Sequence, residues 1–144
     1  MSDDDKATGR CLCGAVKITL TGAHKEVGVC HCGMCRRWGG GPNMAIEVGQ
    51  DIEIDGKEHV TAYRSSDWAE RAFCKVCGTN LYYRIVEADD HVLCAGVLDD
   101  PDGLVLTGQI FIDEKPAFYD FANQTKTMTG AEVFALYAPP ADQT

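Results

Sequence analysis

The sequence predicts a mainly β fold in which irregular loops join short antiparallel strands. Short runs of β-branched and aromatic residues recur along the chain, and Gly, Asp and Asn fill the gaps between them. Helical periodicity is weak. In addition, most of the eight cysteines fall into three clusters, and metal ions held by such clusters would stabilise a fold whose short strands each bury little surface.

The first predicted strand shows the alternation most clearly. Val16, Ile18 and Leu20 alternate with polar residues, and a period of two is typical of a strand with one buried face. Similar runs follow at residues 27–30, 44–48, 52–56, 60–64, 70–74, 81–86, 91–98 and 109–112. Two short helical segments are expected, one turn after Cys35 and a terminal helix over residues 129–138.

The chain of 144 residues has the length of one domain with a substantial core. It contains no internal repeat, Pro-rich or Ser-rich linker or long charged block. The sequence therefore predicts a flexible acidic tail over residues 1–9, a single zinc-binding β domain over residues 10–138, and a flexible C-terminal tail over residues 139–144.

The charge balance restricts the partners of this protein. Its formal net charge is -9, from 13 basic and 22 acidic side chains, so most of the surface repels phosphate backbones and anionic lipid. No run approaches the roughly 20 apolar residues that span a membrane. The N-terminus has neither the basic start nor the apolar core of a secretory signal. We therefore expect no nucleic-acid partner, no membrane partner and a cytoplasmic location, where clustered cysteines bind metal or do redox work.

Two cysteine pairs predict a closed metal site. They stand in C-x-C-G, with Cys11 and Cys13, and in C-x-x-C-G, with Cys74 and Cys77. If the first pair is extended, its side chains leave the same face, and the glycine that ends each motif tolerates a positive φ. Four thiolates bind zinc tetrahedrally. The alternatives are a reduced, metal-free cluster and a thioredoxin-like redox pair. A redox pair would open a helix, but the second motif runs into a strand pattern.

The segment CHCGMC, residues 30–35, supplies three further cysteines, Cys30, Cys32 and Cys35. If the segment is extended, His31 points away from the two flanking sulfurs and is a poor ligand. Two arrangements stay open. Cys94 could complete a second four-sulfur site, or the fourth position could remain open to water or substrate, as in a catalytic zinc site. Cys94 lies among apolar residues, where a lone cysteine is usually a small buried hydrophobe, which favours the open site.

Side chains next to these cysteines are candidates for catalysis and substrate binding. Arg36 and Arg37 could bind the carboxylates of an anionic small molecule, although an arginine pair is also typical of a solvated surface. His31 could relay a proton, since its unperturbed pKa is about 6.5, or it could simply pack in the loop. Tyr119 is expected to pack and not to act in catalysis.

Three segments together resemble one family. RCLCGAVKITL, VCHCGMCRRWGG and FCKVCGTNLYY are similar to the glutathione-dependent formaldehyde-activating enzymes, a family that includes centromere protein V, and the similarity extends from residue 10 to about residue 123. It implies an Mss4-like β fold with two zinc ions per chain. One would be structural, on Cys11, Cys13, Cys74 and Cys77. The other would be more labile and associated with catalysis, on Cys30, Cys32 and Cys35.

The resemblance also implies an activity, the condensation of glutathione with formaldehyde to S-hydroxymethylglutathione, formally a carbon–sulfur lyase reaction. The sequence hypothesis is thus a zinc-dependent enzyme acting on a thiol–aldehyde adduct, with a small thiol such as glutathione as partner and possible homo-oligomers. Two alternatives remain: a non-enzymatic zinc-stapled binding module, and a thiol redox or metal sensor. The fourth ligand of the second zinc distinguishes the enzyme from the module.

Overall fold

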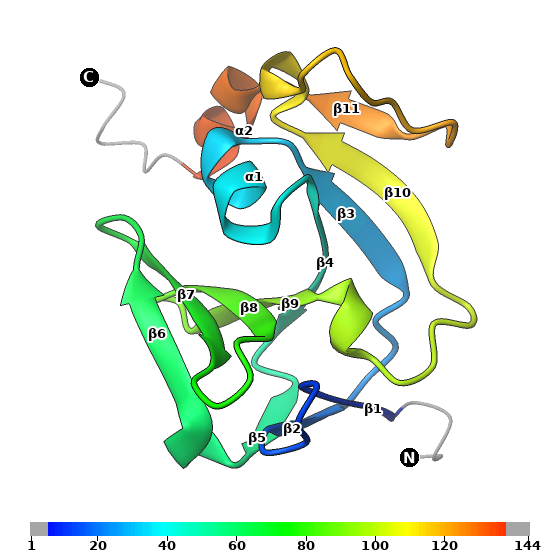
Figure 1. Cartoon of the computed structure of the whole chain (residues 1–144). Helices are drawn as coiled ribbons and strands as arrows, with labels where there is room; N and C mark the ends of the chain where they lie inside the picture. The colour runs from blue at the N-terminus through cyan, green and yellow to red at the C-terminus, as the bar shows by residue number, and fades with distance from the viewer. Residues whose placement is uncertain (1–5, 138–144) are drawn as a thin grey trace. The chain divides into compact units, whose positions relative to one another are not determined.

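The computed structural model describes residues 6–137 and confirms the mainly β architecture (Figure 1). The chain forms two compact units. The first comprises the residues up to Val27 together with Ala45–Val105, and the second comprises Gly28–Met44 together with the residues from Leu106 onward. The predicted domain over residues 10–138 includes parts of both units. Of the predicted tails, residues 1–5 and 139–144 lie outside the described residues.

The first unit contains two sets of antiparallel strands. One set has the order β1-β2-β5, and the other runs β4-β9-β8-β7-β6. The bounds are β1 (Ala7–Arg10), β2 (Lys17–Leu20), β4 (Asn43–Gly49), β5 (Ile52–Asp55), β6 (Val60–Arg64), β7 (Ala69–Cys74), β8 (Asn80–Ile85) and β9 (Asp90–Cys94). β4 starts in the second unit and continues into the first.

The core of the first unit lies on the predicted apolar positions. Ile18 and Leu20 of β2 are each 1% exposed, as their alternation with polar residues requires. In the larger set, Ile46 on β4 faces Leu93 on β9, and neither is more than 1% exposed. Full burial of such a side chain contributes about 1.5–3 kcal/mol. These strands therefore fix the two loops that carry Cys11 and Cys13 and Cys74 and Cys77, respectively.

The second unit contains most of β3 (Glu26–Cys30), most of β10 (Val105–Ile110) and all of β11 (Lys126–Met128), in the order β11-β10-β3. β10 and β11 are parallel, a departure from the purely antiparallel prediction. The long connection over residues 111–125 lets the chain return in the same direction, which a tight hairpin does not allow.

Both predicted helices are present. α1 (Gly33–Gly39) begins two residues before Cys35, and Gly40 ends it in the left-handed conformation, where its N–H donates to the Arg36 carbonyl at 2.8 Å. α2 (Gly130–Tyr137) forms the expected terminal helix. Over the described part of the chain, neither helix has the length and apolar character needed to cross a bilayer.

Four local elements differ from the prediction. The predicted strand over residues 109–112 is shifted: β10 covers Val105–Ile110, and Ile112–Glu114 forms a 3₁₀ turn. β1 includes residues 7–9 of the expected N-terminal tail, because Ala7 pairs with Leu20. β11 was not predicted, since its three residues show no alternation. The predicted strand over residues 91–98 ends at Cys94 and continues as a 3₁₀ turn over Ala95–Val97.

We predict that Gly56→Ala destabilises the first unit. Gly56 has φ +88°, and an added Cβ would lie 2.0 Å from the Ala15 carbonyl oxygen, in the turn that carries Cys13. The left-handed strain and the steric overlap should together lower the free energy of unfolding by about 2–4 kcal/mol. Gly41→Ala is the control, because an added Cβ there meets no atom within 4 Å. Equal urea midpoints for the two variants would contradict the prediction.

Candidate functional site

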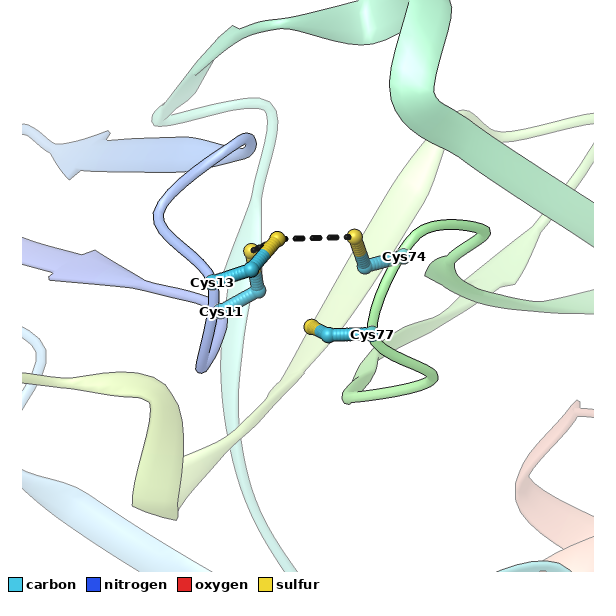
Figure 2. A group of neighbouring side chains, drawn as sticks. All are labelled: Cys11, Cys13, Cys74 and Cys77. Carbon is cyan, nitrogen blue, oxygen red and sulfur yellow. Dashed lines mark hydrogen bonds between the residues drawn. The ribbon is translucent and has the colours of Figure 1, made fainter.

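The first cysteine group has the geometry of a tetrahedral metal site. The sulfurs of Cys11, Cys13, Cys74 and Cys77 all lie within 4.8 Å of one another, and Figure 2 shows them converging from two separate loops. Sγ of Cys13 lies 3.6 Å from that of Cys11 and 3.8 Å from that of Cys74. Zinc–sulfur bonds of about 2.3 Å place tetrahedral sulfurs about 3.8 Å apart. The group therefore fits an ion of this size.

A tight turn presents Cys11 and Cys13, which corrects the expectation of an extended segment. The Cys11 N–H donates to the Val16 carbonyl at 3.1 Å, and the Gly14 N–H donates to the Cys11 carbonyl at 3.2 Å. Gly14 has φ +80°, as predicted. The two sulfurs thus converge because the backbone turns around them.

The second turn follows the same plan and is linked to the first. The Gly78 N–H donates to the Cys74 carbonyl at 2.7 Å, and Gly78 has φ +81°. The Thr79 hydroxyl accepts a hydrogen bond from the Leu12 N–H at 3.0 Å and lies 3.2 Å from the Cys77 sulfur. Thr79 therefore connects the two turns without being a ligand.

The thiols of the first group have divergent pKa values. The Thr79 hydroxyl, aided by backbone N–H groups, lowers the pKa of Cys77 to about 5. For Cys13 the Ala15 N–H lowers the pKa, but burial and the three neighbouring thiols outweigh it and raise the pKa to about 11. Sulfurs this close resist ionising together unless a cation compensates their charge, and a divalent metal would do so.

The second group consists of Cys30, Cys32 and Cys35, whose sulfurs also lie within 4.8 Å of one another. Cys30 ends β3, Cys32 is the N-cap of α1, and Cys35 is buried in the first turn of that helix. The Cys35 N–H donates to the Cys32 sulfur at 3.4 Å. Hydrogen bonds with Cys32 and Cys35, together with burial, raise the pKa of Cys30 far above that of a free thiol. This donor set also suits a soft divalent metal.

Cys94 is in neither group. It ends β9 in the first unit and faces Ala45 of β4. Its side chain is half-buried, in partial agreement with the buried position expected from its apolar neighbours.

His31 is fully buried and is not a member of the second group. Its Nδ1 lies 2.9 Å from the Tyr119 hydroxyl, and its Nε2 lies 2.8 Å from Oε1 of Gln109, whose amide nitrogen donates to the Thr125 hydroxyl at 3.0 Å. Tyr119 also stacks on the imidazole, with 5.6 Å between ring centroids. Gln109 and Thr125 were not predicted as site residues, since both are remote from His31 in sequence.

The two predicted substrate-binding arginines lie in the last turn of α1. Nε of Arg36 donates to the His31 carbonyl at 3.0 Å, so this side chain also supports the loop of the second group. Arg37 is exposed. Burial raises the pKa of Tyr119, although the positive charges of Arg36 and Lys115 oppose that shift.

A family model for the glutathione-dependent formaldehyde-activating enzyme matches residues 6–114. The chain belongs to this family. The match includes both cysteine groups and ends before Tyr119 and Thr125.

Individual proteins similar to this family member support the same assignment. An uncharacterised lyase of Schizosaccharomyces pombe is 36% identical over 126 residues, which is 87% of this chain and 92% of that protein. A Halomonas elongata protein with the provisional name glutathione-dependent formaldehyde-activating enzyme is 31% identical over 83 residues, 51% of this chain and 53% of its own. A crystal structure of a Rhodobacter sphaeroides protein has a TM-score of 0.54 at 26% identity and covers 64% of this chain and 87% of that one. Together, the names indicate a lyase.

Proposed function

We propose that the protein is a zinc-dependent carbon–sulfur lyase that forms and cleaves an adduct of a thiol and an aldehyde, with glutathione and formaldehyde as leading substrates. The observation that carries this proposal is the difference between the two cysteine groups. Four sulfurs complete a tetrahedral shell, but three leave one position for a substrate. The family match and the lyase relative support the same reaction class.

The first group is assigned to a structural zinc. Its four cysteines join the turn between β1 and β2 to the turn between β7 and β8, so metal binding there contributes directly to folding. The second group spans only residues 30–35, and it adds no link between distant segments. A role in chemistry is therefore the better assignment for it.

The reaction needs the thiol in its ionised form. When bound at the second group, zinc would hold an incoming thiol as thiolate near neutral pH, against a free cysteine pKa of about 8.5. In the synthetic direction the sulfur–carbon bond forms, the carbonyl π electrons move to the oxygen, and the proton released by the thiol ends on that oxygen. No oxidant or reductant is required.

The side chains around the second group would bind and orient the thiol. Glutathione carries two carboxylates, and a chain of net charge -9 needs local cations to bind them. Exposed Arg37 is the better candidate for direct contact, because one N–H of Arg36 already supports the loop. The guanidinium of Arg36 retains further donors and adds positive charge near Tyr119. Both ring nitrogens of His31 face other side chains, which favours a supporting role for it over direct proton transfer to substrate.

We predict that the two groups respond differently to loss of one ligand. Cys32→Ser should reduce the zinc content from two ions to one per chain and leave the protein folded. Cys74→Ser should destabilise it by several kcal/mol or abolish soluble expression, because structural zinc contributes about 10–16 kcal/mol of binding free energy in zinc-finger peptides. Zinc content by elemental analysis and thermal unfolding measure both effects. Equal unfolding of the two variants would contradict the assignment.

The proposed activity is tested by exchange NMR with ¹³C-formaldehyde and glutathione. The wild-type protein should accelerate formation and breakdown of S-hydroxymethylglutathione, and Cys32→Ser should abolish the acceleration. Arg37→Gln should raise KM for glutathione about two- to fivefold, the size of an exposed ion pair, with no such change for an uncharged thiol. Lys17→Gln, an exposed change on β2, is the control. No acceleration by zinc-loaded wild type would refute this reaction and favour the binding-module or sensor hypotheses.

A further inference from the structure

His31 is held at four separate points, all within the second unit. Its N–H donates to the Ile110 carbonyl at 3.2 Å, and its carbonyl accepts from Nε of Arg36 at 3.0 Å. Its two ring nitrogens contact Tyr119 and Gln109. A residue with 0% exposure and partners for both its backbone and its ring nitrogens has little freedom to reorient. Since His31 lies between Cys30 and Cys32, whatever fixes this residue also fixes the backbone that joins two ligands of the second group.

The hydrogen bonds around His31 have a defined direction. The Gln109 amide nitrogen donates to the Thr125 hydroxyl, so the amide oxygen is the atom that faces the imidazole. That oxygen only accepts, and Nε2 of His31 must therefore carry the proton and donate. In neutral histidine Nδ1 then bears a lone pair, which accepts from the Tyr119 O–H. With its amide in this orientation, Gln109 favours the tautomer that carries the proton on Nε2.

Gln109 occupies a position that strand formation alone does not explain. It lies on β10, is only 7% exposed, and faces Thr127 across the parallel pair with β11. Burial of an amide is unfavourable unless its polar atoms are paired. Here the oxygen pairs with His31 and the nitrogen with Thr125, so the buried amide supports the loop of the second group in particular.

We propose that Gln109, oriented by Thr125, is a positioning residue for the second metal centre. It fixes the imidazole of His31 and thereby holds Cys30 and Cys32 at ligand spacing before a metal ion or a thiol arrives. This role rests on the proposed function of Cys30, Cys32 and Cys35. Partners one shell removed from a metal typically change its affinity by about 10- to 100-fold when they are removed, and His31 transmits such an effect through the backbone.

The test compares Gln109→Leu and Thr125→Val with wild type. With the first group saturated, zinc affinity at the second group is measured by competition with a chromophoric chelator. Gln109→Leu should weaken it about 10- to 100-fold, and Thr125→Val, which keeps the side-chain shape, should weaken it in the same direction. The first group should stay within threefold of wild type. Gln50→Leu is the matched control, because that exposed glutamine lies in the first unit and donates to the Ala88 carbonyl at 3.3 Å, far from His31 in sequence.

A second readout needs no metal. Long-range ¹H–¹⁵N NMR of the His31 ring should show the proton on Nε2 in wild type and loss of that single tautomer in Gln109→Leu. Second-group affinity within threefold of wild type in both variants, or a wild-type proton on Nδ1, would overturn the proposal. If Gln109→Leu does not fold, the zinc affinity and the His31 tautomer of Thr125→Val test the proposal instead.

Different measurements test the positioning role of Gln109 and the catalytic role of the second group. If the wild-type second group binds no zinc, the catalytic assignment fails, and the alkylation rates of Cys30 and Cys32 in the first-site zinc form then test the positioning role. Rates unchanged by Gln109→Leu would overturn it, and rates changed severalfold at these two cysteines would support it.

Discussion

The crowding of thiols is the constraint on which the first unit depends. Cys13 and Cys74 are 61 positions apart in sequence, yet their sulfurs lie 3.8 Å apart. Four sulfurs at this spacing cannot all ionise without a compensating cation, and a single tetrahedral ion accommodates all of them. The binding free energy of an ion held there would then be part of the folding free energy. Strands of four to seven residues would otherwise depend on a small amount of buried surface.

The second group is under a different constraint, because all its cysteines come from one short segment. Its geometry derives from the end of β3, the first turn of α1, and the contacts that hold His31 from β10 and the segment around Tyr119. The fold supplies the arrangement of its three sulfurs. An ion bound there could consequently exchange a ligand without disrupting distant strands, as the proposed reaction with a substrate thiol requires.

Much of this architecture could be predicted because local sequence patterns determine it. Alternation along residues 16–20 predicted β2, and the motif glycines predicted the positive φ at Gly14 and Gly78, which the structure confirms. The convergence of the cysteine groups also followed from motif spacing. The turn around Cys11 could not be predicted in this way, because C-x-C is compatible with both a strand and a turn. Only its hydrogen bonds to residues 14–16 distinguish the two. Gln109 could not be found either, since it lies 78 positions from His31 and its local signal is a single polar residue in a strand.

X-ray absorption at the zinc edge, on protein loaded with two ions per chain, tests the open fourth position most directly. One four-sulfur site and one three-sulfur site per chain predict an average of about 3.5 sulfurs per zinc. The average should rise to about 4 when glutathione is added. An average of about 4 before any thiol is added would contradict the open position, because it would mean that a sulfur of the protein itself completes the second site.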